Sequence, residues 1–178
     1  MRKIIALCAV LFGYAAAALA QQYPAGEVFV GYSHEIADVD RSQTNLDGFQ
    51  LSAAENINHW FGCMLDFSEH LARINQATVH TETIAFGPQF AYRKLPSLTP
   101  SAHVEVGVVH GNRGFLGNST SGTHAAFVAG GALDYKLRQN FSIRVIQADW
   151  IRTSFQDLSR NNVRLSAGLL VRFSFRNR

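Results

Sequence analysis

The stretch VRLSAGLLVRFSF, residues 163–175, alternates between two kinds of side chain. Its odd-numbered positions are all apolar and end in Phe173 and Phe175, whereas its even-numbered positions include Arg164, Arg172, two serines and a glycine. Successive side chains of an extended strand point to opposite faces, so this segment predicts a strand with one apolar and one largely polar face. A strand over a soluble core shows the same pattern, so the rest of the chain must identify the environment.

The first twenty residues, MRKIIALCAVLFGYAAAALA, have the organisation of a secretory signal peptide. Arg2 and Lys3 form a basic beginning, an apolar run follows, and the small residues Ala18 and Ala20 flank Leu19 as in a cleavage site. A membrane anchor would need a basic stop-transfer cluster, and none follows the run. We therefore expect cleavage after Ala20, with residues 21–178 forming one domain.

Without that leader, fourteen basic residues face thirteen acidic ones, a net charge of +1. This balance gives no reason to expect nucleic acid as a partner. Cys63 is the one cysteine left, so an internal disulfide framework is excluded. No later apolar run approaches the roughly 18 residues that a membrane helix needs.

Alternation of apolar and polar residues continues through the remaining chain in eight segments. The expected strands cover residues 27–37, 46–59, 63–74, 80–94, 101–112, 124–137, 141–155 and 163–175. Segments of about ten residues or more match tilted strands that cross a bilayer. The connections at 38–45 and 113–122 look like long polar loops, whereas those near 60, 95–100 and 138–140 look like tight turns.

Long loops at one end and short turns at the other are typical of an outer-membrane barrel. We therefore predict an all-β protein, an eight-stranded antiparallel up-and-down transmembrane β-barrel. Lipid cannot satisfy free backbone groups, and a closed barrel leaves no unpaired edge. The apolar face of residues 163–175 would then contact lipid, and the arginines would face the lumen.

The same phase assigns charged residues of both signs to the lumen. They are Asp66, Arg93, Glu105, Asp134, Arg144, Asp149, Arg164 and Arg172. An eight-stranded barrel is just wide enough for side chains to fill it, and buried charges must be paired. We expect a charged network that plugs the lumen; a narrow gated pore is the alternative.

Residues 141–155 do not keep one phase throughout. Phe141, Ile143 and Val145 alternate with polar residues, but Gln147 and Asp149 then fall on positions that should contact lipid. A β-bulge near 145–146 would turn both side chains inward, because it adds one residue to one strand. The other possibility is a stretch free of lipid near the outer rim.

Aromatic residues gather at the ends of the predicted strands, where headgroups favour amphipathic rings. Trp60, Phe61, Phe90, Tyr92, Phe141, Phe173 and Phe175 fall near the turns, and Tyr32, Trp150 and Phe155 near the opposite rim. We interpret them as aromatic girdles; core aromatics of a soluble β-sandwich are the alternative.

Motifs of known catalytic chemistry are missing from the sequence. The seven histidines have no H-E-x-x-H or comparably tight metal-ligand spacing, and no G-x-S-x-G occurs. Ser101 and His103 share one face of a strand, as in some lipid-modifying barrels, but they lie at the turn end. We expect no enzyme, no catalytic residues, no cofactor and no metal.

With its strands placed, the chain resembles the small OmpA-like or opacity-type outer membrane protein beta-barrel domain family. The resemblance rests on FGPxxxYR (Phe86, Gly87, Pro88, Tyr92, Arg93) and GGxLD (Gly130, Gly131, Leu133, Asp134), within segments that cover seven of the eight strands. It implies an eight-stranded barrel in the bacterial outer membrane but no reaction. Larger relatives carry a peptidoglycan-binding domain after the barrel; no such domain precedes Arg178, so wall tethering is not expected.

Three functions compete at this point. The favoured one is a Gram-negative outer-membrane protein with a structural or surface-interaction role, both termini in the periplasm, and external loops at 38–45 and 113–123. Its expected partners are outer-membrane lipid and the assembly machinery, and we expect a monomer; the partner of its loops is unknown. A narrow channel is the second. A soluble periplasmic lipocalin-like binder of an apolar ligand is the third, and it would point the apolar face inward.

Overall fold

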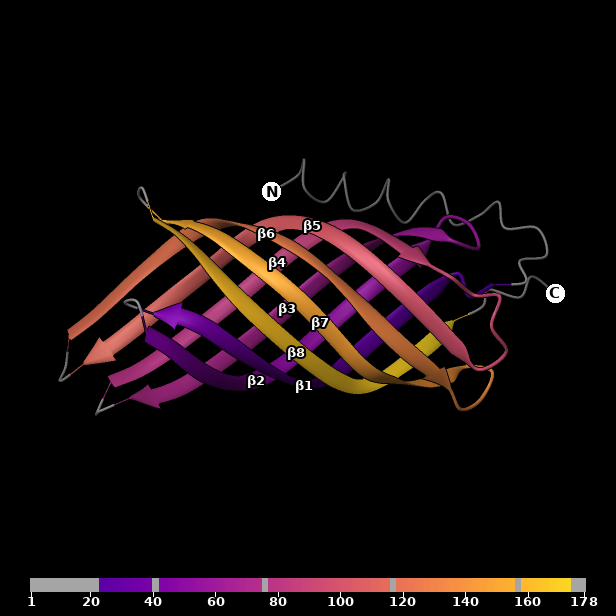
Figure 1. The fold of residues 1–178 in the computed structure, drawn as a ribbon, viewed down its shortest axis with the longest axis horizontal. Helices are drawn as coiled ribbons and strands as arrows, with labels where there is room; N and C mark the ends of the chain where they lie inside the picture. Colours follow the sequence, from indigo (N-terminus) through magenta and orange to yellow (C-terminus); the bar gives the residue numbers. More distant parts are fainter. Residues whose placement is uncertain (1–22, 40–41, 75–76, 116–117, 156–157, 174–178) are drawn as a thin grey trace, which may run out of the picture.

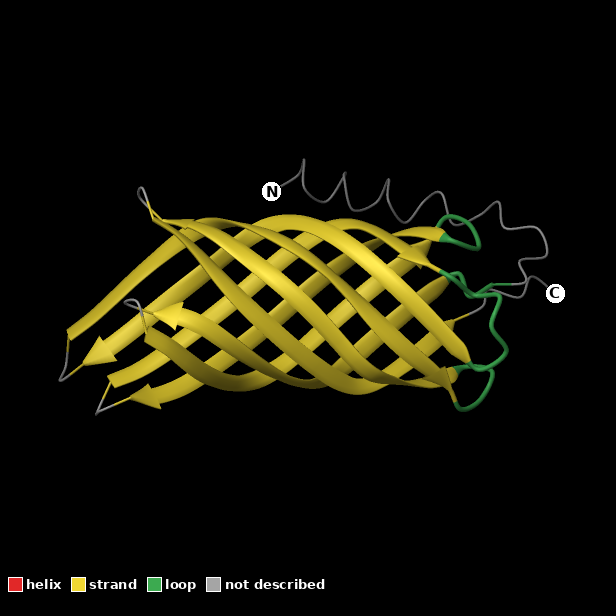
Figure 2. Ribbon diagram, viewed as in Figure 1, coloured by secondary structure: helices red, strands yellow, loops and turns green. Residues whose placement is uncertain are grey.

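A computed structural model describes residues 23–39, 42–74, 77–115, 118–155 and 158–173, which form eight long strands (Figures 1 and 2). The strands are β1 (Gly26–Val39), β2 (Ser42–Asn56), β3 (Phe61–Ile74), β4 (Ala77–Ala91), β5 (Leu98–Phe115), β6 (Asn118–Lys136), β7 (Phe141–Phe155) and β8 (Leu158–Phe173). Across these residues no helix is long and apolar enough to span a membrane. The predicted signal peptide at 1–20 and the predicted girdle residue Phe175 lie outside the described residues.

The strands pair in chain order and close into a barrel. Every pair is antiparallel, and β8 returns to β1 from Gly26↔Phe173 to Ile36↔Val163. The predicted fold class is therefore confirmed. The end of the barrel that holds Gly26, Phe173 and the connections 57–60, 92–97 and 137–140 is called the near end below, and the opposite end the far end; Figure 2 shows the near-end connections in green.

Side chains alternate between the lumen and the outer surface as the sequence pattern requires. In β8, Arg164 is fully buried, whereas Leu169 is 55% exposed and Phe173 45% exposed. The same division holds in the other strands, where buried residues are largely polar and exposed ones include many valines, leucines and aromatics. The lipocalin-like alternative is therefore wrong, because it required the apolar face inside.

The predicted β-bulge in β7 is confirmed. Leu133 pairs with Ile146 and Asp134 with Arg144, so Val145 has no partner of its own on β6. On the other side, the register of β7 with β8 shifts between Arg144 and Gln147. Val145 and Ile146 both face outward, and the next polar residue, Gln147, is fully buried. One extra residue thus keeps the polar side chains of β7 in the lumen over its whole length.

The predicted long loops at 38–45 and 113–122 were wrong, because most of these residues extend the strands. β1 continues to Val39 and β2 begins at Ser42, and β5 and β6 continue to their pairing Phe115↔Asn118. Cross-strand backbone hydrogen bonds form without regard to side-chain polarity, so polar hairpins can continue beyond an apolar belt. The predicted asymmetry is reversed: the near-end connections are the longer ones, at four to six residues.

The outer surface carries an apolar belt of bilayer thickness. In β5, the outward residues from Leu98 to Val108 are Leu98, Pro100, Ala102, Val104, Val106 and Val108. The ten residue-to-residue steps from Leu98 to Val108, at a tilt of about 40°, span roughly 26 Å, close to the apolar band of outer-membrane barrels. On the far side the belt ends at exposed or half-buried polar pairs: His34–Asp47 at 2.8 Å, His80–Glu69 at 2.9 Å and His110–Thr123 at 2.8 Å.

Candidate functional site: the charged lumen

The lumen is organised around the fully buried Arg164 of β8. Its guanidinium lies 2.8 Å from Asp66 Oδ1 and 2.7 Å from Asp149 Oδ2, and it also donates to Ser68 Oγ at 2.7 Å. Gln50 donates a hydrogen bond to Asp66. One arginine therefore joins strands β3, β7 and β8 across the lumen, and its charge is balanced by two carboxylates.

Asp149 holds further partners that depend on a glycine opposite it. His103 Nε2 lies 3.0 Å from Asp149 Oδ1, and Gln147 donates to Asp149 Oδ2 at 2.9 Å. Gly130 pairs with Asp149 across β6 and β7. A Cβ at Gly130 would lie 2.1 Å from Asp149 Oδ1 and 2.9 Å from His103 Nε2. Only a glycine leaves room for this contact, which explains one glycine of the GGxLD motif.

A second arginine carries the network toward the near end. Arg144 Nε donates to Asp134 Oδ1 at 2.8 Å, and its Nη1 donates to Gln147 Oε1 at 2.7 Å. The guanidinium also lies over the ring of Phe29, 4.6 Å from the centroid, a cation–π arrangement. Gln147 thus connects the Arg164 cluster to the Arg144 cluster.

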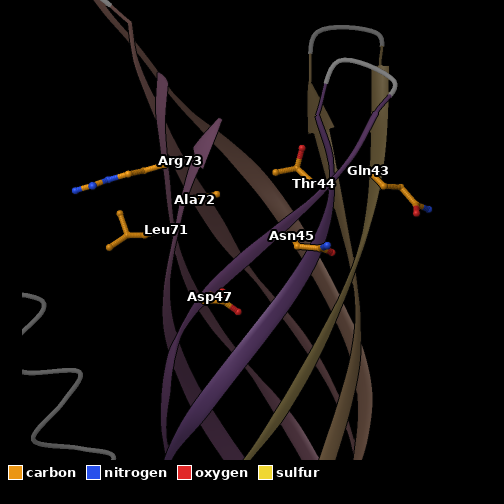
Figure 3. Close-up of a pocket in the computed structure, with 7 residues that line it drawn as sticks. All are labelled: Gln43, Thr44, Asn45, Asp47, Leu71, Ala72 and Arg73. Carbon is orange, nitrogen blue, oxygen red and sulfur yellow. The ribbon is translucent and has the colours of Figure 1, made fainter. Parts of the chain in front are cut away.

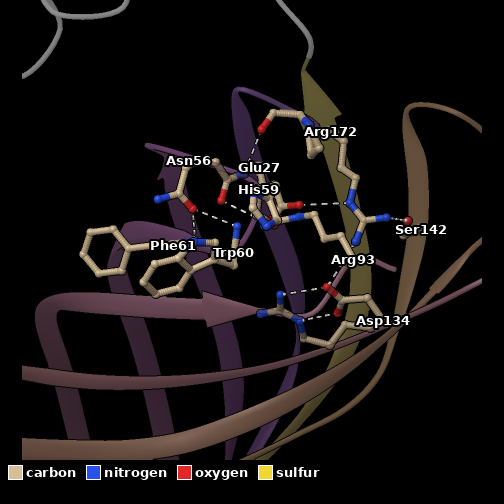
Figure 4. Close-up of polar contacts among 12 residues, drawn as sticks. Glu27, Asn56, His59, Trp60, Phe61, Arg93, Asp134, Ser142 and Arg172 are labelled. Atoms are coloured by element: carbon tan, nitrogen blue, oxygen red, sulfur yellow. Dashed lines mark hydrogen bonds and ion pairs between the residues drawn. The ribbon is translucent and has the colours of Figure 1, made fainter. Parts of the chain in front are cut away.

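Glu27 links two more arginines at the near end (Figure 4). Arg172 Nε lies 3.0 Å from Glu27 Oε1, and its Nη2 lies 3.5 Å from Asp134 Oδ2. Arg93 Nη2 lies 3.4 Å from Glu27 Oε2 and donates to Asn56 Oδ1 at 2.8 Å. Ion pairs and hydrogen bonds therefore continue from Asp66 in the middle of the barrel to Arg93 at its near end.

Seven of the eight charged residues expected in the lumen thus contact one another, directly or through Gln147 and Glu27, whereas the carboxyl oxygens of Glu105 have no hydrogen-bond partner among the described residues. Arg93 is partly buried. The other seven are buried, namely Asp66, Glu105, Asp134, Arg144, Asp149, Arg164 and Arg172. The structure adds Glu27, Glu35 and His70, which the sequence analysis did not place. The alternation was present in the first segment, residues 27–37, where one face carries Glu27, Phe29, Ser33 and Glu35. These residues were missed because the two faces of this segment were not assigned.

Glu35 and His70 extend the polar lumen toward the far end. Asn162 donates to Glu35 Oε1 at 2.6 Å, and His70 Nδ1 lies 3.2 Å from Glu35 Oε2. The other ring nitrogen of His70 lies 2.8 Å from Ser33 Oγ, which in turn accepts from Ser166 at 2.9 Å. These groups form a separate polar cluster.

Apolar side chains also enter the far half of the lumen. One buried cluster contains Ala85, Val109, Ala126, Val128 and Ile151. A second contains Ala37, Leu46 and Val79, with Ala72 packed against it. Water has no hydrogen-bond partners in such packed clusters, so they narrow any polar path through the barrel.

A groove opens at the far end between β2 and β3 (Figure 3). The two strands pair only as far as Asp47↔Leu71, although both continue beyond it. The groove has a volume of about 500 Å³ and is lined by Gln43, Thr44, Asn45, Asp47, Leu71, Ala72 and Arg73. Its lining is mostly polar and lies past the apolar belt.

The predicted girdle aromatics lie on the outer surface. Trp60, Phe61 and Phe90 form a cluster with ring centroids 5.4–5.9 Å apart near the 57–60 connection. Tyr92, Phe141 and Phe173 are exposed at the same end. Trp150 packs edge-on against Phe127 at 6.2 Å, farther along β7, and Tyr32 donates a hydrogen bond to Asp47. Phe155 lies at the end of β7, where its side chain is outside the described residues.

No metal-binding group of three or more His, Cys, Asp or Glu side chains occurs in the part of the chain that the structure describes. Ser101 and His103, considered above as a catalytic pair, lie on neighbouring inward positions of β5, and the ring of His103 contacts Asp149.

Comparison with known proteins identifies the family. The family model for the outer membrane protein beta-barrel domain matches residues 5–173. The chain belongs to this family. Membership agrees with the barrel, its apolar belt and its polar lumen, and it supports a location in the bacterial outer membrane.

Solved structures show the same fold at low sequence identity. Neisserial surface protein A (NspA) matches with a TM-score of 0.70 at 12% identity, over 86% of this chain and all of that chain. Ail of Yersinia pestis matches with a TM-score of 0.60 at 18% identity, covering 84% of this chain and 99% of Ail. OprG of Pseudomonas aeruginosa matches with a TM-score of 0.54 at 10% identity, over 87% and 98% of the two chains. Curated protein sequences gave no significant match.

Proposed function

We propose that this protein is an outer-membrane surface protein whose lumen is closed and whose far-end strands make its external contacts. The observation that carries the proposal is the continuous network from Asp66 to Arg93, because it fills the space that a pore would need. The lumen residues then serve stability, and interaction falls to the outer surface.

Closure of the lumen is supported by both charge and packing. An eight-stranded barrel has an interior just wide enough for side chains to fill. Arg164 and Arg144 reach across that interior with two or more partners each, so an ion on this path would have to displace buried pairs. Removing one partner of a buried pair typically costs about 3–5 kcal/mol because it leaves an uncompensated charge, so separating these pairs to open the lumen is also unfavourable.

The far end is the better candidate for external contacts. Strands β3 to β6 continue as a four-stranded sheet beyond the last β2–β3 pair, Asp47↔Leu71, and the last β6–β7 pair, Ala126↔Thr153. The sheet lies past the apolar belt and next to the groove lined by Gln43 and Arg73. An even number of strands puts both ends of the barrel chain on one side, so periplasmic termini would place this sheet outside the cell.

A relative of the same fold supports an external binding role. Ail of Yersinia pestis has been crystallised in complex with the heparin analogue sucrose octasulfate. At 18% identity this complex is a precedent for ligand binding by a small barrel of the same fold.

The experiment inserts a short epitope between Leu116 and Gly117, in the sequence that connects β5 to β6. We expect the folded protein to bind the antibody on intact cells, because Phe115↔Asn118 is the outermost pair of that hairpin. The matched control carries the epitope between Gln139 and Asn140 at the near end, and it should bind only after permeabilisation. The opposite pattern for the two insertions would overturn the proposed orientation.

A further inference from the structure

Glu105 differs from every other described carboxylate of the lumen. Each of the other five contacts an arginine or accepts a hydrogen bond from a neutral side chain. They are Glu27, Glu35, Asp66, Asp134 and Asp149. Glu105 is 1% exposed, and neither of its carboxyl oxygens has a hydrogen-bond partner among the described residues. An ionised carboxylate without a partner is costly to bury, and the usual response of proteins is to neutralise it.

The charges around Glu105 do not supply the missing partner. Arg164 is the cation that acts on it, and Asp66 and Asp149 act on it with the opposite sign. Arg164 is itself bound by those two carboxylates, at 2.8 and 2.7 Å. His103, on the same face of β5, already contacts Asp149. A negative charge on Glu105 would therefore be a third carboxylate beside one arginine.

Two further neighbours of Glu105 are uncharged, and one of them has a hydrogen-bond acceptor without a donor. Val128 lies opposite it on β6. On β4, Gln89 pairs with His103, which makes Gln89 a diagonal neighbour of Glu105 within the reach of long side chains. Gln89 is 3% exposed, and its Oε1 has no hydrogen-bond partner. A neutral carboxylic acid has one O–H to donate, which is what this acceptor needs.

We propose that the lumen binds one proton at Glu105, which is held as a neutral carboxylic acid and donates to Gln89. Loss of this proton places an unpaired charge beside Asp66 and Asp149 and weakens the folded barrel. The site goes beyond the surface role proposed above, and it gives the closed lumen a group that responds to alkaline pH.

Infrared spectroscopy of the folded, full-length protein in lipid tests the site directly. The wild type should show the C=O stretch of a buried carboxylic acid near neutral pH, and Glu105→Gln should lose it. Glu27→Gln is the matched control, because Glu27 is equally buried but ion-paired, and it should keep the band. A wild-type spectrum without the band, or a band that persists in folded Glu105→Gln, would overturn the proposal.

Equilibrium unfolding between pH 5 and pH 10 gives a second readout. Glu105 is neutral in the fold and ionises readily when unfolded, so its contribution is present at low pH and is lost as pH rises. For each unit by which the pH rises, the folding equilibrium constant of the wild type should fall by up to tenfold more than the folding equilibrium constant of Glu105→Gln falls. Near pH 6 Glu105→Gln should stay within about threefold of the wild type, and Glu27→Gln should fall more than tenfold. Parallel pH profiles of the wild type and Glu105→Gln would contradict the proposal. If Glu105→Gln does not fold, the infrared C=O band of the wild type is followed with pH instead. The proposal requires that this band is present near neutral pH and is lost as pH rises.

Discussion

At the scale of single residues, buried charge is tolerated because each arginine meets more than one acceptor. Arg164 is the clearest case, with Asp66, Asp149 and Ser68 around one guanidinium. Its burial could be predicted from alternation alone, since a charge on the lipid face would cost about 2–4 kcal/mol near the midplane. Its partners could not, because they lie on β3 and β7, and their meeting depends on strand registers that alternation does not fix.

Arg164→Leu should destabilise the barrel by about 3–5 kcal/mol, because Asp66 and Asp149 would lose a shared buried cation. Thermal unfolding in detergent measures the loss. Arg152→Leu is the control, since Arg152 is exposed on the outer surface of β7, and it should change stability far less. Equal melting temperatures for Arg164→Leu and the wild type would show that these contacts do not stabilise the fold.

Glu105 shows the limit of residue-level prediction. Its position on the inner face follows from the alternation Val104, Glu105, Val106, but nothing in that pattern separates a paired carboxylate from an unpaired one. The distinction depends on what β3, β4, β7 and β8 place opposite it. Glu27, which joins Arg93 to Arg172, was missed for a different reason, because the two faces of residues 27–37 were not assigned.

At the scale of elements, the eight strands and the bulge of β7 were predictable, whereas their far-end lengths were not. The bulge could be found because Gln147 and Asp149 break a clear apolar phase. The far-end extensions have no apolar face, since polar residues such as Gln43, Asn45, Asn112 and Ser121 occupy them, and this resembles a loop. Backbone pairing with a neighbour makes them strands, and single-sequence periodicity does not detect it.

Deletion of Val145 tests the bulge. Removing the extra residue should force either Arg144 or Gln147 and Asp149 toward lipid, because a shift of one residue exchanges the two faces of a strand. We expect little folded barrel, measured as loss of the fast-migrating band in unboiled electrophoresis. Val145→Ala keeps the bulge and should fold, so wild-type folding of the deletion variant would show that the bulge does not set the phase.

At the scale of the whole molecule, the barrel presents an apolar belt on its outer surface, and its polar side chains meet inside. Family membership and the structures of NspA and Ail agree with this architecture. Both the belt and the closed eight-stranded barrel could be anticipated from composition and alternation. The position of the groove between β2 and β3 could not, because it arises where two paired hairpins separate.

The lumen network predicts a closed barrel, and recording from planar bilayers tests this closure most directly. Purified, folded protein should insert without steady conductance, because Arg164 and Arg144 occupy the path with their partners. Folding of the same preparation is checked by the slower migration that boiling should cause. Stable ohmic steps from protein that passes this check would contradict the account and show that the lumen is a channel.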